Sequence, residues 1–366
     1  MIPLAIPHLA GNEERYLQEC VQTNFVSSVG PFVDRFETQV AEAAGARGAV
    51  ATSSGTSALH AALLSVGVGR DDLVIAPSFT FIATVNAVAH CGARPWLVDV
   101  DEQSWTLDPA GLRDALSQGR KVAAIVPVYT LGTPARMDEI VALARQHCIP
   151  VVADAAAALG ATWDGRPSGA LGATLSTYSF NGNKTITAGG GGAVVGDDEA
   201  LLGQVRHLTT TARVDGDYTY DRVGYNYRLT NLQAAVGCAQ LEQLQSHVGR
   251  KRAIARRYAK ELLEAGDLPG ISSFPVPERA RSGCWFSGVL LDRPAEAVVA
   301  ALRERGVGAR PFWKPAHLQA PFADCLRGPL PVTEGIWRRV LTLPCSVGLT
   351  DDDQARVIDA VRAVLG

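Results

Sequence analysis

YSFNGNKTITAGGGGAVV, residues 178–195, sets one lysine, Lys184, between two apolar runs that are typical of β-strands. The turn around it is rich in glycine and asparagine, which are common where a chain reverses direction. Lysine is mostly exposed in proteins, so a lysine in a surface turn is the ordinary explanation of this stretch. The apolar run on each side, and the serine–aromatic sequence TYSF that leads into the turn, favour a lysine that faces a site.

Outward from this stretch, apolar strand patterns alternate with helical patterns along the first part of the chain. We predict strands at 48–52, 73–77, 95–100, 122–128 and 150–154, and helices at 12–24, 32–44, 55–67, 80–92, 109–117 and 136–147. Strands that are apolar throughout belong to a parallel sheet that is covered on both faces. The pattern therefore predicts an α/β fold with a large, mostly parallel sheet and helices on both faces.

The second part of the chain has a different pattern. A polar stretch at 212–224 interrupts the alternation, and a long helical segment follows at about 230–266. Beyond it we predict a strand at 284–292, a helix at 295–306 and a C-terminal helix from Asp351, with antiparallel character. This division predicts a large domain with an N-terminal arm at 1–248 and a smaller α+β domain at 249–366.

Composition narrows the class of protein. Of 366 residues, 47% are hydrophobic and 19% are charged, which is a globular composition, and the net charge is −3. The sequence contains no basic stripe, so we expect no nucleic-acid partner. It also contains no apolar run of about 18 residues, so we expect no membrane partner. The N-terminus lacks the pattern of a signal peptide. The seven cysteines form no C-x-x-C pair, which argues against a disulfide framework or a metal site and favours the cytoplasm.

The predicted strands end in loops that suit a ligand, because open parallel sheets bind ligands at their carboxyl ends. The stretch SSGTSALH (53–60) opens a helix whose free N–H groups, with the hydroxyls of Thr56 and Ser57, suit a phosphate. An ordinary Ser/Thr helix cap explains this stretch equally simply and is favoured when the stretch is taken alone.

Two further stretches lie at strand ends. Asp154 closes a buried apolar strand, where an ionised carboxylate needs a positive partner, although a helix-capping role is equally open. Phe79 and Phe81 follow another strand, where an aromatic ring can stack on a planar ligand. Taken alone, core packing is the favoured explanation of both phenylalanines.

Together, these parts match the requirements of pyridoxal phosphate. A helix start holds the phosphate, an aromatic ring covers the pyridine, a carboxylate keeps the ring nitrogen protonated, and a lysine forms a Schiff base with the aldehyde. Asp154 and Lys184 are the residues that carry this hypothesis.

The chain also resembles a known family, the DegT-type (DegT/DnrJ/EryC/StrS) sugar-nucleotide aminotransferases, which have the aspartate-aminotransferase-like fold (fold type I) and use pyridoxal 5'-phosphate. The motifs that carry the resemblance are FVSSVG (25–30), SGTSALH (54–60), PSFTFIATVNAV (77–88), DAAAALGA (154–161), SFNGNK (179–184), HLTTTAR (207–213), GYNYRLTNLQ (224–233), RPFWKPAHLQ (310–319) and LPCSVGLT (343–350). Within the family, the chain looks most like the legionaminic-acid and bacillosamine type, with perosamine synthases next.

The resemblance implies roles for matching positions near the cofactor. Lys184 would be the Schiff-base lysine and proton shuttle, Asp154 would pair with the pyridinium nitrogen, and Phe81 would stack on the ring. The phosphate would be held by Gly55, Thr56, Ser57 and Ser179.

Further roles implied by the resemblance concern a second subunit and the substrate. Asn226 would reach the phosphate of the neighbouring subunit's cofactor, which requires a homodimer with shared active sites. His317 and Arg213 would lie near the sugar nucleotide. Ala157 and Tyr129 depart from the residues that many relatives carry at these positions, and both departures bear on the identity of the sugar.

The function implied by the resemblance is transfer of the amino group of glutamate to C4 of a nucleotide-linked 4-keto-6-deoxy sugar. The expected acceptor is UDP-4-keto-6-deoxy-N-acetylhexosamine, in bacterial surface-glycan (polysaccharide) or nonulosonic-acid biosynthesis. The alternatives are a GDP-perosamine synthase, a C3 sugar aminotransferase, and a non-catalytic regulatory protein of the same fold. Because Lys184 and Asp154 are both present, we expect an enzyme, and Lys184 also argues against the deoxygenating branch that carries histidine there.

Overall fold

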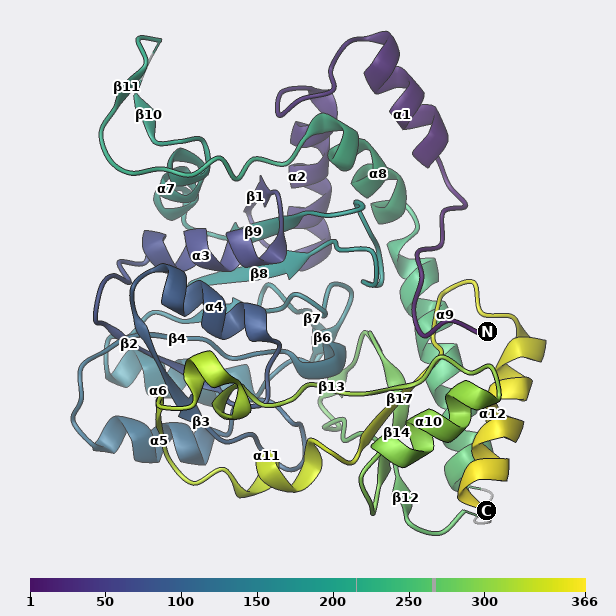
Figure 1. Ribbon diagram of the computed structural model, residues 1–366. Helices are drawn as coiled ribbons and strands as arrows, with labels where there is room; N and C mark the ends of the chain where they lie inside the picture. The colour runs from purple at the N-terminus through teal and green to yellow at the C-terminus, as the bar shows by residue number, and fades with distance from the viewer. Residues whose placement is uncertain (215, 265–267) are drawn as a thin grey trace.

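The structure is a computed structural model that describes residues 1–214, 216–264 and 268–366 (Figure 1). Its helices are α1 (Glu13–Gln22), α2 (Pro31–Ala44), α3 (Gly55–Ser65), α4 (Ile82–His90), α5 (Pro109–Ser117), α6 (Met137–Gln146), α7 (Glu199–Thr209), α8 (Asn231–Leu241), α9 (Leu244–Tyr258), α10 (Glu296–Glu304), α11 (Pro331–Ile336) and α12 (Asp351–Leu365). The predicted helices before residue 150 are all present, with their ends shifted by a few residues.

A large sheet forms the centre of the molecule. One half has the order β1 (Gly48–Thr52), β9 (Gly192–Gly196), β8 (Leu175–Ser179), β5 (Val152–Asp154), and the other has the order β4 (Val122–Ile125), β2 (Leu73–Pro77), β3 (Arg94–Val98), β16 (Leu326–Arg327). Parallel bridges Ile125–Val151 and Val128–Asp154 join β4 to β5. Strand β9 runs antiparallel to β1 and β8, and the other pairings are parallel. The prediction of a mostly parallel sheet is confirmed.

Alternate residues of each strand enter different cores, because successive side chains of a strand point to opposite faces. One core contains Val50, Val74 and Val194 of the sheet together with Leu59 of α3, Ala87 of α4 and Val205 of α7. The other contains the next residues along the same strands, Ala51, Ile75 and Val195, together with Phe36 of α2, Leu112 of α5, Ile140 of α6 and Ala235 of α8. Helices therefore cover both faces of the sheet.

The C-terminal part of the chain builds a smaller antiparallel sheet. Its order is β12 (Ile271–Ser272), β14 (Ser287–Leu291), β17 (Val340–Leu343), β15 (Arg310–Pro311). Helices α9, α10 and α12 contribute Ile254, Leu302 and Val357 to its core. The N-terminal arm enters the same core, since Ile2 forms a parallel bridge with Val307 and is buried there.

The remaining strands are short pairs near the surface. They are β6 (Thr162–Trp163), β7 (Arg166–Pro167) and β13 (Ala280–Arg281), which form one small sheet, and β10 (Arg213–Val214) with β11 (Thr219–Tyr220), which form a protruding hairpin (Figure 1).

The helical segment predicted at 230–266 is divided in the structure, so the single long helix is wrong. It forms α8, α9 and a π-helix at Ala259–Glu264, and the end of the prediction at 265–266 lies outside the described residues. Three side chains contact Glu242 at the break, namely Asn12, Tyr16 and Arg35, so tertiary contacts fix the end of α8. Helix α9 joins the two cores, with Val248 in the large one and Ile254 in the small one.

The domain division near residue 248 stays a prediction. The chain crosses it more than once, because β16, at Leu326–Arg327, pairs with β3 in the large sheet. Among the helices of the described chain, none combines the length and the apolar character needed to cross a membrane.

Candidate active site

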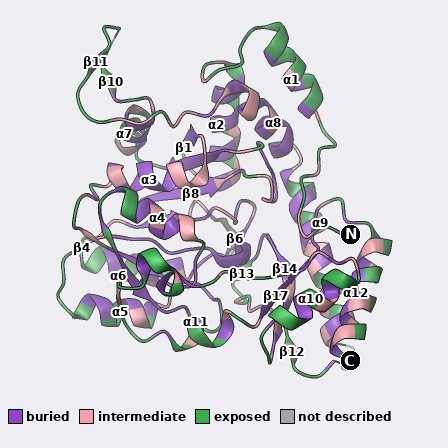
Figure 2. Ribbon diagram, viewed as in Figure 1, coloured by how far each residue is buried: buried purple, intermediate pink, exposed green. Residues whose placement is uncertain are grey.

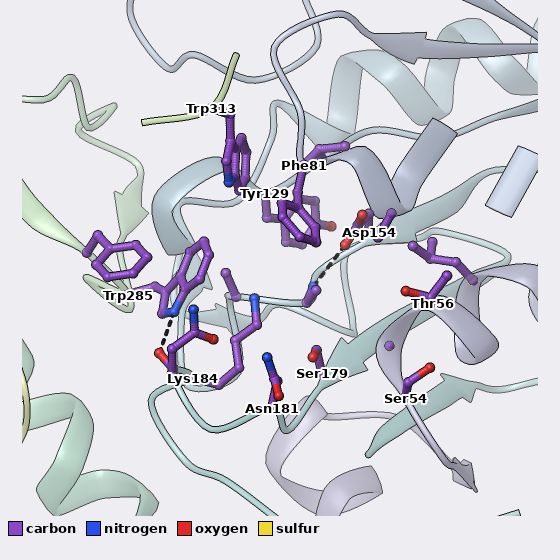
Figure 3. A pocket seen from close by; sticks show the side chains of 18 of the residues that line it. Ser54, Thr56, Phe81, Tyr129, Asp154, Ser179, Asn181, Lys184, Trp285 and Trp313 are labelled. Atoms are coloured by element: carbon purple, nitrogen blue, oxygen red, sulfur yellow. Dashed lines mark hydrogen bonds between the residues drawn. The ribbon is translucent and has the colours of Figure 1, made fainter. Parts of the chain in front are cut away.

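A cavity of about 590 Å³ lies where β1, β5 and β8 end, between the large sheet and the C-terminal part of the chain. Its walls include Leu4 near the N-terminus and the C-terminal residues Trp285, Arg310 and Trp313. Several predicted site residues line it together, namely Gly55, Thr56, Phe81, Asp154, Ser179 and Lys184. Figure 3 shows the side chains of Lys184, Asp154 and Phe81 converging on this space.

Asp154 ends β5 and is 6% exposed. The hydroxyl of Thr84, on α4, donates to its Oδ2 at 2.7 Å, and the backbone N–H of Ala156 donates to its Oδ1 at 3.2 Å. Burial raises the pKa of the Asp154 carboxyl, while these hydrogen bonds and the charge of Lys184 act in the opposite direction. Turns rather than a helix follow in residues 155–161, so the helix-cap alternative is wrong.

Lys184 closes a turn in which its backbone N–H donates to the carbonyl of Asn181 at 3.0 Å. Its Nζ lies 3.7 Å from the ring centroid of Trp285, and the Trp285 Nε1–H donates to the Asn183 carbonyl at 2.8 Å. Burial lowers the pKa of the Lys184 amine to about 8, against the opposing effect of Asp154. A lysine that lines a cavity and is partly neutral near pH 7 is not a surface-turn lysine, so that alternative is wrong.

The first turn of α3 forms one wall. The Ser54 Oγ accepts a hydrogen bond from the Ser57 N–H at 3.0 Å, as a helix cap does. A Cβ on Gly55 would lie 2.8 Å from the Cβ of Ser179, so glycine allows α3 and the end of β8 to meet. The hydroxyls of Thr56 and Ser179 make no hydrogen bond within the described part of the chain. The turn is thus both a capped helix start and a wall with donors available for an anion.

The phenylalanines near the end of β2 have different environments. Phe79 is 0% exposed and packs in the small-domain core, whereas Phe81 is 54% exposed and lines the cavity. Core packing, the favoured explanation of each residue alone, is correct for Phe79 and wrong for Phe81. An aromatic ring exposed to this extent beside a buried carboxylate offers a flat surface for a planar ligand.

The other predicted site residues do not line the cavity. Ser57 hydrogen-bonds to Ser54, and Asn226 is exposed on the segment that bridges to Thr210. His317 is buried and its Nδ1 shares a 2.7 Å hydrogen bond with Ser78. Arg213 lies in the β10–β11 hairpin, where its guanidinium stacks on Tyr218 at 4.4 Å. The roles of these residues stay predictions.

Some residues that shape the site could not be predicted from local sequence patterns. Trp285 belongs to an apolar strand-like run, and its contact with Lys184 spans a hundred residues of sequence. Thr84 lies within PSFTFIATVN, four residues after Thr80, which precedes α4, and the two hydroxyls hydrogen-bond at 2.7 Å. That spacing is the one available clue to a polar partner for Asp154.

The residues of the cavity fit pyridoxal phosphate. A buried carboxylate has no ion pair within the described residues, a lysine amine is free of hydrogen bonds there, and a helix start offers donors near unused hydroxyls. The carboxylate suits the ring nitrogen of that cofactor, the lysine amine suits its aldehyde, and the helix start suits its phosphate. Fold and site together therefore define a pyridoxal phosphate-dependent enzyme.

Comparison with known proteins gives the family. The model of the DegT/DnrJ/EryC1/StrS aminotransferase family matches residues 7–362. The chain is 38% identical over 369 residues to GDP-perosamine synthase of Caulobacter vibrioides, with coverage of 100% of this chain and 98% of the relative. It is 37% identical over 371 residues to EpsN of Bacillus subtilis, named as a pyridoxal phosphate-dependent aminotransferase, with coverage of 98% and 95%.

Solved structures agree with this match. The crystal structure of S. venezuelae DesV is 34% identical and has a TM-score of 0.89, with coverage of 96% of this chain and 94% of that one. The chain belongs to the DegT/DnrJ/EryC1/StrS aminotransferase family and is a pyridoxal phosphate-dependent aminotransferase. The prediction of this family, of its fold type and of its cofactor is confirmed.

Proposed function

We propose that this enzyme transfers the amino group of glutamate to C4 of a nucleotide-linked 4-keto-6-deoxy sugar. The observation that carries the proposal is the meeting of Lys184, Asp154 and the α3 helix start in one cavity of a chain similar over its whole length to a sugar aminotransferase. An amine can be delivered in this way only to a ketone or an aldehyde, which fits a keto sugar as acceptor.

The chain's own residues have separate tasks in holding the cofactor. The N–H groups of the α3 start, with Gly55, Thr56 and Ser179, would hold the phosphate, and Phe81 would cover one ring face. When bound, pyridoxal phosphate supplies an aldehyde that condenses with amines and a ring that accepts the electron pair left when a C–H bond breaks. Asp154 would keep the ring nitrogen protonated, because a buried carboxylate is stabilised by a positive partner.

Lys184 would move the proton in both half-reactions. Its Nζ takes a proton from Cα of glutamate in the first half-reaction and returns one to C4 of the sugar in the second. The amine must be neutral to accept the proton, and burial, which lowers its pKa to about 8, increases the neutral fraction near pH 7.

The nucleotide of the acceptor has two candidates. The UDP-linked N-acetylated sugar fits the cavity, because Ala157, Gly190 and Gly191 line it and leave room for a substituted ring, and a hydroxyl-bearing sugar fits there as well. The relatives named GDP-perosamine synthase, at 38%, 32% and 33% identity, support a GDP-linked sugar as the second candidate. Both share the 4-keto group that the proposed chemistry requires.

An acceptor assay tests the proposal. The purified enzyme with glutamate is given either UDP-4-keto-6-deoxy-N-acetylglucosamine or GDP-4-keto-6-deoxymannose, and the product is read by mass and by NMR at the aminated carbon. We expect nitrogen at C4 of the UDP sugar. Turnover of the GDP sugar alone would show that the acceptor is GDP-linked and not UDP-linked. Nitrogen at C3 would contradict the proposed amination at C4.

We further propose a homodimer with shared active sites. Asn226, outside the cavity of its own chain, is exposed and free to reach a neighbouring one. Large apolar side chains are exposed nearby in the chain and around residue 25, with Val223 80%, Tyr218 75% and Val29 61% exposed. Figure 2 shows the hairpin and much of α1 as exposed surface. Such exposed apolar side chains suit a protein interface.

Mixed dimers test the shared site. Combining Lys184→Ala chains with Asn226→Ala chains should create hybrids in which one site has both residues intact, so activity should exceed that of either parent. The matched control combines Lys184→Ala with Asp154→Asn, whose residues line the same cavity of one chain and should not complement. A lack of recovery in the first mixture, or a monomer in solution, would contradict the shared site.

A further inference from the structure

The amine of Lys184 lies against an aromatic ring that is itself fixed in place. Trp285 is 4% exposed, and its Nε1–H donates to the Asn183 carbonyl at 2.8 Å (Figure 3). Its backbone N–H donates to the carbonyl of Leu131 at 3.0 Å, and its carbonyl accepts from the Nζ of Lys251 at 2.8 Å. Trp285 is therefore fixed by contacts with Asn183, Leu131 and Lys251 while its indole ring contacts Lys184.

The indole face is the direct contact of the Lys184 amine. Among the residues that the structure describes, Nζ makes no hydrogen bond and no ion pair, and it lies 3.7 Å from the Trp285 ring centroid. A cation above an aromatic face is attracted by the ring quadrupole, most strongly by that of tryptophan, and the attraction grows when water is excluded. This contact favours the ammonium form of the lysine and does not act on the neutral amine.

We propose that Trp285 is a positioning residue that binds the ammonium form of the Lys184 amine when the amine is not bonded to the cofactor, in equilibrium with the neutral form that accepts a proton. The proposal rests on the role proposed above for Lys184. After the amine leaves the cofactor it needs a place in the cavity where its charge is tolerated, and the indole face provides one. Trp285 thereby helps to set the fraction of Lys184 that is neutral and ready to accept a proton.

Other charged and titratable groups surround the amine and have to be separated from the effect of Trp285. Asp154, Tyr129 and Arg310 line the same cavity, Lys251 of α9 donates to the Trp285 carbonyl, and His247 lies near Lys251 on the same helix. Asp154 favours the ammonium form of Lys184, whereas burial disfavours it. Leucine at position 285 removes the indole face but keeps an apolar side chain beside the amine, so the pKa of Lys184 should fall further below its ordinary value.

The test measures the capture of pyridoxal phosphate by the apoenzyme, which requires a neutral lysine amine. The rate of capture is followed by the visible absorbance of the lysine-bound cofactor as a function of pH. For the wild-type chain we expect a midpoint below the ordinary pKa of a lysine, because burial lowers the pKa of the Lys184 amine. For Trp285→Leu we expect the midpoint to fall by about one pH unit, and for Trp285→Phe by less.

The matched control is Trp313→Phe. Trp313 lines the same cavity with its ring centroid 6.0 Å from that of Trp285, and no contact links it to the Lys184 amine. Its midpoint should equal that of the wild type. A purely structural role for Trp285 would lower the melting temperature or the extent of capture in the Leu variant and leave the midpoint unchanged.

An unchanged or raised midpoint in folded Trp285→Leu would overturn the proposal. If that variant does not fold, Trp285→Phe is tested in its place, because it keeps an aromatic ring. A midpoint equal to that of the wild type in Trp285→Phe would then overturn the proposal. Reduction with borohydride and peptide mapping is done on each captured sample. An adduct on a lysine other than Lys184 in the wild type would refute the proposed function itself, which separates the two failures.

Discussion

Lys184→Ala is expected to lower transamination by a factor of at least about 10⁴, because one amine serves as both cofactor attachment and proton carrier. The variant should still bind pyridoxamine phosphate, since the phosphate wall at Gly55 and Ser179 and the carboxylate of Asp154 remain. Turnover is measured with glutamate and the keto sugar, and binding by retention of the cofactor through gel filtration.

Lys184→Arg provides the matched control, because it keeps a positive charge and removes the nucleophilic amine. It should be as inactive as the alanine variant, whereas substantial activity would show that the charge alone is needed. Borohydride reduction of the wild-type holoenzyme should place the pyridoxyl group on Lys184. The competing site is Lys251, a buried lysine whose Nζ hydrogen-bonds to the Trp285 carbonyl, and an adduct there would contradict the assignment.

Much of the large domain could be predicted because its strands are apolar on both faces. Val50 and Ala51 are neighbours in β1, and each is buried in a different core, so a strand of this kind needs helices on both sides. The same local pattern gave the positions of the helices, since each must cover a strip of the sheet.

Features set by distant contacts could not be predicted from the pattern. The antiparallel direction of β9 depends on its pairing with both β1 and β8. The apolar run GAVV predicts a buried strand but does not indicate the direction in which the strand runs. The return of β16 to the large sheet involves the pair Leu326–Arg327, which is too short to form a signal. The end of α8 is fixed by side chains that contact Glu242 from α1 and α2.

Some residues of the candidate site could likewise be predicted from the sequence, and others could not. Asp154 could be placed because it ends a strand and strand ends meet at one edge of a parallel sheet, whereas the family resemblance alone indicated Ser179. Phe79 and Phe81 are two residues apart with similar surroundings in sequence, and the small-domain core buries the first while the second faces the cavity. Trp285 reaches Lys184 only because the C-terminal part of the chain packs near the end of β8, and no local pattern encodes that contact.

Asp154→Asn is expected to lower turnover by a factor of about 10² to 10³, because it removes a charge that would stabilise the protonated ring nitrogen in a buried site. The asparagine has nearly the same volume, and its side-chain oxygen can still accept from the Thr84 hydroxyl, so the fold should persist. Thr84→Val is the matched control: it removes a hydrogen-bond donor and keeps the carboxylate, and should cost about tenfold or less.

Thermal unfolding of the apoenzyme separates a role in chemistry from a role in the fold. Burial raises the pKa of the Asp154 carboxyl above its value in the unfolded chain, so the folded state binds more protons and loses stability as pH rises between the two values. At pH 7 the ionised carboxylate therefore opposes folding, and asparagine removes that cost. The melting temperature of the Asp154→Asn apoenzyme should equal or exceed that of the wild type while turnover falls. A lower melting temperature with near-normal turnover would mean that Asp154 serves the fold and not the reaction.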